Sequence, residues 1–349
     1  MCCGCGHDSS SDRIVCMRSF DVDPGIAGSA CCSRYCQCLP GSGARFYRGD
    51  MSSTELRTEI RDFLSSRRAR ITPEEAGLPA YGGNRRVKGL RREEVAMLAG
   101  VSVDYYIRME RGSLTGASDS VLDSLASALR LDDAERDHLF ALAHQSHSTP
   151  PRRKRSTATS VRPALQQVLD AVVDAPAWIR NGRHDIVAMN PLARALYSPV
   201  LESGRRPANT SRFVYLEPEA AREFFVDYDQ ITRDAAAMLR LEAGKNPHDK
   251  ALIELVGELS TQSELFRKYW ASQDVRFHRS GRKRLRHPIV GQLDLDFEAM
   301  ELPSEPGLHL NIYTAAAGTP TADAIKMLAS WAASRDSLPT ETKNSDKLH

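Results

Sequence analysis

The chain has 349 residues, and its 47 Lys and Arg residues nearly balance its 45 Asp and Glu residues, which gives a formal net charge of +2. This charge is too small to indicate a nucleic-acid binder, so any basic surface has to be local. We find no apolar run near the roughly 18 residues that cross a bilayer, and we expect no membrane insertion. At about 100 to 200 residues per domain, the length favours two domains.

All eight cysteines precede Met51, at positions Cys2, Cys3, Cys5, Cys16, Cys31, Cys32, Cys36 and Cys38. A secreted disulfide framework would distribute cysteines through the folded part, so we expect a cytoplasmic protein. Cys2 and Cys5 form one CxxC pair near His7, but the other cysteines lack clean zinc-finger spacing, and we predict no metal. We expect residues 1–50 to be a disordered leader, or a segment upstream of a physiological start at Met51.

The first predicted helix runs from Thr54 to about Arg70, where Leu56, Ile60 and Phe63 recur at helical spacing. A long loop follows, and the entrance to the next helix is rich in cations. The predicted phosphate-contacting residues are Arg85, Arg86, Lys88, Arg91 and Arg92. The alternative is an ordinary solvated run of charge.

Residues 90–112, LRREEVAMLAGVSVDYYIRMERG, have the pattern of two short helices joined by a turn. Gly100 occupies the turn, Ser102 can cap the second helix and Gly112 can end it. Ala96, Val101, Tyr106 and Met109 supply the core of the pair. This pattern is the helix-turn-helix signature of DNA-binding proteins.

In such a motif, the first residues of the second helix contact base edges in the major groove. We therefore predict DNA contacts from Ser102, Val103, Asp104, Tyr105 and, one turn later, Arg108. Asp104 is equally explained by the helix dipole, which favours a carboxylate in the first turn. Tyr106 is predicted to face the core, and Tyr105 to face outward.

Two more helices are predicted to complete a five-helix domain at residues 51–145. One carries Leu122, Leu125 and Leu129, and the other carries Leu139, Phe140 and Leu142 after the capping residues Asp132 and Asp133. We predict that His138, His144 and His147 are surface residues. Residues 146–160, SHSTPPRRKRSTATS, have the composition of a linker.

The second predicted domain, residues 161–335, begins with a helix and two short strands around the turn Asn181-Gly182. A largely helical middle follows, in which Phe224, Tyr228 and Ile231 recur at helical spacing. The period then changes to two, which predicts strands near residues 284–289, 293–297 and 308–312, before a last helix and a disordered tail at 336–349. Two strands, then helices, then about three antiparallel strands is the order of a PAS-like sensor.

Four segments, RREEVAMLAGVS, DYYIRMERG, VLDSLASALRLDDAERDHLFALA and PAWIRNGRHDIVAMNPLA, resemble the XRE-family helix-turn-helix regulators, and more narrowly the MmyB-like regulators of actinobacteria. The resemblance covers about Thr54 to Trp331. It implies an all-α helix-turn-helix domain followed by an α+β PAS-like ligand-binding domain with an antiparallel sheet. It also implies fatty acids as the ligand class.

An antiparallel sheet covered by helices can enclose a ligand cavity on its apolar face. The candidate lining residues are Trp178, Met189, Phe213, Phe224, Met238, Phe266, Trp270 and Phe297, although most of them could simply be core. Asn190 and Arg240 are the candidate anchors for a carboxylate. Asn190 could instead cap the helix that Pro191 begins, and Asp294 and Asp296 fit a solvated strand face better than a metal site.

These features predict a DNA-binding transcriptional regulator of the nucleoid, with double-stranded operator DNA as its partner. We expect a homodimer on a palindromic operator and a small apolar ligand, without any other cofactor. An enzyme is not expected, because the chain has no GxSxG or HExxH motif and Gly244-Lys245 lacks the upstream glycine of a phosphate loop. The alternative is a regulator whose second domain binds a protein and no small ligand.

Overall fold

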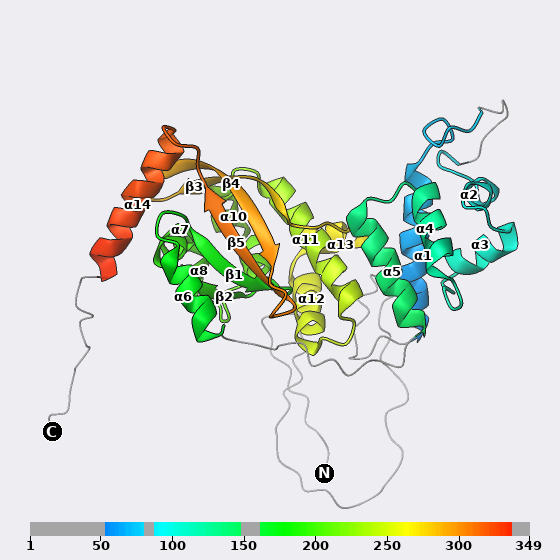
Figure 1. Cartoon of the computed structure of the whole chain (residues 1–349), viewed down its shortest axis with the longest axis horizontal. Helices are drawn as coiled ribbons and strands as arrows, with labels where there is room; N and C mark the ends of the chain where they lie inside the picture. The colour runs from blue at the N-terminus through cyan, green and yellow to red at the C-terminus, as the bar shows by residue number, and fades with distance from the viewer. Residues whose placement is uncertain (1–52, 80–86, 148–160, 337–349) are drawn as a thin grey trace, which may run out of the picture. The chain divides into compact units, whose positions relative to one another are not determined.

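The computed structural model describes residues 53–79, 87–147 and 161–336. Predictions for residues 1–50, for Arg85 and Arg86, for most of the linker and for the tail therefore lie outside the described residues. The first described region holds α1 (Ser53–Arg70), α2 (Arg92–Leu98), α3 (Val103–Glu110), α4 (Asp119–Ala128) and α5 (Asp133–His147) (Figure 1). None of the described helices is both long enough and apolar enough to span a membrane.

The helix-turn-helix pair forms where the sequence predicts it. Gly100 has φ +67° in the turn between α2 and α3, a conformation that costs glycine little. Gly112 ends α3 with φ +98°, and a Cβ atom there would lie 2.4 Å from the carbonyl oxygen of Arg57. Because Gly112 has no side chain, the end of α3 can pack directly against the backbone of α1.

The prediction of a surface position for His138 is wrong. Its side chain is completely buried between α5 and α1, with its ring 5.0 Å from that of Phe63. The helix that carries it begins as predicted, because Asp132 and Glu135 bond each other's backbone N–H groups at 2.9 and 3.2 Å in a capping box. His144 is exposed as predicted, and the side chain of His147 lies outside the described residues.

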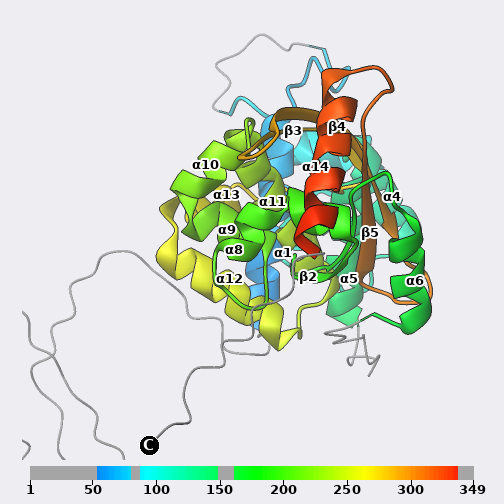
Figure 2. The same cartoon turned by 90° about the vertical axis from the view of Figure 1, so that its left-hand side faces the viewer.

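The second described region combines helices with one five-stranded sheet (Figure 1, Figure 2). Its elements in chain order are α6 (Pro163–Ala171), β1 (Ala177–Asn181), β2 (Ile186–Met189), α7 (Pro191–Leu196), α8 (Ser198–Glu202), α9 (Thr210–Leu216), α10 (Pro218–Phe224), α11 (Tyr228–Lys245), α12 (Lys250–Gln262), α13 (Glu264–Ala271), β3 (Ser280–His287), β4 (Gly291–Glu301), β5 (Leu308–Thr314) and α14 (Pro320–Asp336). All neighbouring strands are antiparallel, in the order β2-β1-β5-β4-β3. The predicted α+β class is confirmed.

The two faces of the central strands pack into two different cores. Ala177 and Ile179 of β1 pack with Leu310 of β5 and with α6, whereas Trp178 and Tyr313 face the larger aromatic core. Side chains of β5 therefore alternate between the two faces, as the period of two predicted. The face that carries Asn311 is buried, however, and does not contact solvent. Alternation reaches solvent in β4, where Asp294 and Asp296 are exposed as predicted.

Two local details differ from the simplest interpretation of the sequence. The residue with positive φ in the β1–β2 hairpin is His184, at +67°, and not Gly182. Gly182 allows a close helix contact, because a Cβ atom there would lie 2.3 Å from the side chain of Glu242. The helical spacing of Phe224 and Tyr228 also crosses a break between α10 and α11. There the backbone N–H of Val226 donates to the carbonyl of Arg284 in β3 at 3.1 Å.

Candidate functional site

The first turn of α3 exposes the side chains predicted to contact bases. Ser102 caps the helix by accepting the backbone N–H of Tyr105 at 3.2 Å, while Val103 and Asp104 are exposed. The guanidinium of the exposed Arg108 lies 4.8 Å from the ring centre of Tyr105, which is half-buried although it was predicted to face outward. A cation over an aromatic face is held in place by the ring quadrupole, so Tyr105 positions Arg108.

The basic residues before the motif have different roles. Lys88 and Arg91 are exposed. The backbone N–H of Arg91 donates to the carboxylate of Glu94 at 2.6 Å, and this negative charge compensates the unfavourable arginines at the N-terminus of α2. Arg92 instead forms an ion pair with Glu110, a buried carboxylate that also accepts from Arg68 at 2.7 Å. The primary role of Arg92 in this structure is therefore to hold α2 against the end of α3.

Two further cations lie beside the recognition helix and were missed from the sequence. Arg57 of α1 and Arg111, just after α3, line a shallow surface hollow together with Asp104 and Arg108. Arg57 is far from the motif in sequence, and the close packing of α1 against Gly112 brings it there. Arg57 and Arg111 therefore extend the basic surface beyond the cations at residues 85–92, to the side of α3 that faces α1.

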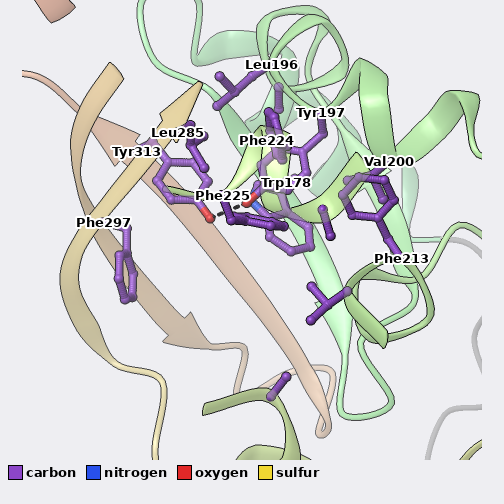
Figure 3. Close-up of a cluster of buried hydrophobic side chains, with 14 of the residues drawn as sticks. Trp178, Leu196, Tyr197, Val200, Phe213, Phe224, Phe225, Leu285, Phe297 and Tyr313 are labelled. Atoms are coloured by element: carbon purple, nitrogen blue, oxygen red, sulfur yellow. Dashed lines mark hydrogen bonds between the residues drawn. The ribbon is translucent and has the colours of Figure 1, made fainter. Parts of the chain in front are cut away.

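The inner face of the sheet packs against a cluster of aromatic side chains. Figure 3 shows Trp178, Tyr197, Phe224 and Tyr313 around the hydroxyl pair of Tyr197 and Tyr313, whose oxygens are 2.7 Å apart. The ring centre of Tyr197 lies 5.1 Å from that of Trp178 and 5.9 Å from that of Phe224. The helices over the sheet and the sheet itself therefore meet at one aromatic core.

Six of the eight predicted lining residues are buried in this core, namely Trp178, Met189, Phe213, Phe224, Phe266 and Phe297. Trp270 is half-buried at its edge and stacks on Phe266 with ring centres 5.4 Å apart. Met238 is half-buried on α11 and is not part of the cluster.

The two predicted carboxylate anchors are both committed to other partners. The Oδ1 atom of Asn190 accepts from the backbone of Ala193 and Ala177, and its Nδ2 atom donates to the carbonyls of Val172 and Ala175, all at 2.6–3.1 Å. Asn190 is thus the cap of α7, which is the alternative that its sequence context allowed.

Arg240 is buried at the junction between the two regions and faces α1. Its guanidinium donates to Glu59 and to the carbonyl of Trp270, and it lies 4.2 Å from the centre of the Trp270 ring. Burial acts to raise the pKa of Glu59, but Arg240 and the nearby His138 outweigh it and lower the pKa to about 2. Arg240 therefore already has a carboxylate partner, which comes from α1 and not from a ligand.

The junction is extended by a second buried arginine and by a close helix contact. Arg67 of α1 bonds Glu135 at 2.8 Å and the carbonyl of Gln273 at 2.5 Å. At Gly244 of α11, a Cβ atom would lie 2.4 Å from His138 Nδ1, so only glycine allows α11 to approach α5 this closely.

Two apolar residues of the second region belong to the core of the helical bundle. Leu241 and Val275 are buried in the same cluster as Ile60, Phe63 and Leu142. A small apolar pocket adjoins this contact, lined by α1 and α5 on one side and by α11, α12 and α13 on the other. The two regions therefore share one continuous interior at α11.

Buried polar groups on the inner sheet face were also missed from the sequence. Within the described residues, Arg180 Nε, Trp178 Nε1 and Asn311 Oδ1 are buried without a hydrogen-bond partner. An arginine in the fully buried strand AWIRN was the available signal, because an ionised side chain is rarely buried without a partner.

Comparison with protein families finds two matching models. Residues 62–139 match a helix-turn-helix domain, and residues 161–328 match the MmyB-like transcription regulator ligand binding domain. Comparison with curated proteins finds no match. The chain therefore joins a DNA-binding helix-turn-helix domain to an MmyB-like ligand-binding domain, the combination that its resemblance to the MmyB-like regulators predicted.

Proposed function

We propose that the protein is a one-component transcriptional regulator, in which a small apolar ligand bound in the second domain changes operator binding by the first. The proposal is carried by α11. Two consecutive residues of this helix contact the two domains: Glu242 lies against Gly182 in the β1–β2 hairpin, and Leu241 is buried in the core of the DNA-binding bundle. A shift of α11 on ligand binding would move α1 and α5 with it.

The ligand has to favour one arrangement of the domains, because equal binding to both arrangements would shift nothing. Fatty acids are the class implied by the family resemblance. The inner face of the sheet supports this class, because its side chains are largely aromatic and aliphatic. The order of two strands, several helices and three further strands supports a PAS-like architecture for the domain.

At the DNA, we propose that α3 enters the major groove, with Ser102, Val103, Asp104, Tyr105 and Arg108 facing the bases. Lys88, Arg91 and the newly identified Arg57 and Arg111 would contact phosphates, and so would Arg85 and Arg86. We propose a homodimer on a two-fold operator, which light scattering of the free protein and of its DNA complex would test. A regulator of this kind acts in the cytoplasm, at the nucleoid.

The test begins with the selection of bound sequences from a pool of random DNA, using the full-length protein. Fluorescence anisotropy then gives the affinity for the selected site and for random DNA, with and without candidate fatty acids. We expect a specific, salt-dependent complex whose affinity changes when the ligand is added. A ligand that binds without any change in operator affinity would contradict coupling, and capture of a protein with no small ligand would favour the alternative of a protein-binding module.

A further inference from the structure

The segment between α13 and β3, residues 272–279, contacts both domains, and we call it the connector. Val275 is buried in the core of the DNA-binding bundle, and Phe277 packs against the same core. Arg276, between them, points the other way and pairs with Asp234 of α11 at 3.1 Å. Successive side chains of an extended chain point to opposite sides, and this segment has that alternation. The connector therefore presents one face to each domain.

At the end next to β3, the connector reaches the aromatic core of the second domain. His278 stacks on Phe297 of β4, with ring centres 4.2 Å apart and 17° between the ring planes. Phe297 in turn contacts Tyr313, with 6.1 Å between the ring centres, and Figure 3 shows both in the aromatic cluster where the proposed ligand binds. Because protein interiors are close-packed, a displacement of Phe297 has to move His278 as well.

At the end next to α13, two arginines of α1 hold the connector. Arg67 donates to the carbonyl of Gln273 at 2.5 Å, and Arg70 forms an ion pair with Asp274. Gln273 has φ +60°, a left-handed conformation that is unfavourable for a glutamine. A strained residue persists only where its surroundings hold it, so loss of these contacts would let the connector change its shape.

The helix α1 links this hold to the DNA-binding surface. Arg67 and Arg70 lie near its C-terminal end, whereas Arg57 lies near its start and lines the hollow beside α3 together with Arg108. The distance from Arg57 to Arg67 is about 15 Å along the helix axis, at a rise of about 1.5 Å per residue. A regular helix moves as one body over this distance, so a displacement at the connector also moves Arg57.

We propose that the connector transmits ligand binding in the second domain to the DNA-binding bundle. A ligand that enters the aromatic core displaces Phe297 and His278, and the alternation of the segment then shifts Val275 and Phe277 in the core of the bundle. This inference rests on the proposed function and assigns its coupling to a second element beside α11. The helix α11 is regular, whereas the connector lies in a loop with a strained residue, the kind of segment that can adopt two arrangements.

The first test measures how saturating decanoate changes the operator affinity of the full-length protein, by fluorescence anisotropy. We expect a change of at least about fivefold for the wild type, the lower end of typical coupling between two sites. His278→Ala should reduce this change to less than about twofold, while its separate affinities for decanoate and for operator stay within about threefold of the wild type. His278→Phe, which keeps a ring on Phe297, should retain the wild-type change.

A variant at the other end of the connector tests the same path with little risk to the fold. Asp274→Asn breaks the pair to Arg70, in which both side chains are nearly half exposed, and should reduce the decanoate response in the same way. The control is Asp296→Asn, which breaks an exposed pair to Arg282 on β3 and should keep the full response.

A second measurement needs no ligand. Hydrogen exchange of the full-length protein should be at least about threefold faster in the last two turns of α1 in His278→Ala than in the wild type, and unchanged in His278→Phe. A full decanoate response in His278→Ala, or unchanged exchange in α1, overturns this inference and leaves the proposed function in place. Decanoate that does not bind the wild type, or that binds without changing its operator affinity, counts against the proposed function, and the exchange result then decides whether the connector joins the domains.

Discussion

Removal of the ion pair at the junction of the two domains should weaken the whole protein. In Arg240→Met, the carboxylate of Glu59 remains four-fifths buried and loses its cation. The lowering of its pKa from 4.5 to about 2 corresponds to roughly 3 kcal/mol of stabilisation of the charged form. Breaking a buried pair by removing one partner costs a similar amount, about 3–5 kcal/mol. We expect a loss of about 3 kcal/mol in the free energy of unfolding.

A double-mutant cycle with Glu59→Gln isolates the pair. Because His138 contributes to the lowered pKa as well, the coupling energy between Glu59 and Arg240 should be about 2 kcal/mol. Urea unfolding of the full-length protein gives each free energy, and tryptophan fluorescence suits it because Trp270 lies under the guanidinium. The control is Arg282→Met, which breaks an exposed pair to Asp296 of β4 and should cost at most about 1 kcal/mol. Strictly additive losses for Glu59 and Arg240 would refute the described junction.

Three further predictions concern packing, pH and DNA. Gly244→Ala should destabilise the protein by about 1–3 kcal/mol in urea unfolding, because the new methyl group overlaps His138. Burial lowers the pKa values of His138 and His184, so their neutral forms stabilise the fold above pH 6.5; stability should fall as the pH drops below 6.5 towards these folded pKa values, by up to about 1.4 kcal/mol per unit for each histidine. Arg108→Ala should cost about 1–3 kcal/mol of affinity for the selected operator, measured by anisotropy, and little for random DNA.

The packing and DNA predictions have matched control variants, and the pH prediction has a result that would contradict it. Gly257→Ala in α12, where a Cβ atom meets nothing within 4 Å, should be neutral or stabilising by up to about 1 kcal/mol. Burial lowers the pKa values of His278 and His287 too, so Gln variants of His138 and His184 should each reduce this dependence on pH. Unfolding free energies that stay level from pH 7.5 to 5.5 in the wild type would contradict the prediction. Lys88→Ala should weaken operator and random DNA alike and reduce the salt slope by about one. Equal losses on both DNAs for Arg108→Ala would rule out base reading.

Local signals in the sequence were sufficient for most of the secondary structure. The turn at Gly100, the cap at Ser102 and the buried Tyr106 follow from spacing alone, and the structure contains all three. The β4 strand likewise follows from the alternation around Leu295. These features depend on neighbours within a few residues, so the sequence contains the information directly.

The missed residues have partners that are distant in the chain. His138 is buried because Gly244 of another domain covers it, and the pKa of Glu59 is lowered because Arg240 reaches it. The helical spacing of apolar residues in α1 and α5 contains no information about these distant partners. Arg180 is the exception, because a cation inside a strand buried on both faces is itself an anomaly that the sequence could have revealed.

The presence of Leu241 and Val275 in the core of the DNA-binding bundle bears on how such regulators can be recombined. A hybrid that joins residues 53–147 to an unrelated sensor would inherit a bundle with two apolar side chains missing from its interior. Each fully buried side chain of this size contributes about 1.5–3 kcal/mol. A working graft would therefore have to carry the segments around Leu241 and Val275 along with the helices that bind DNA. The DNA-binding unit that can be exchanged between regulators is thus larger than the domain that ends at the linker of residues 146–160.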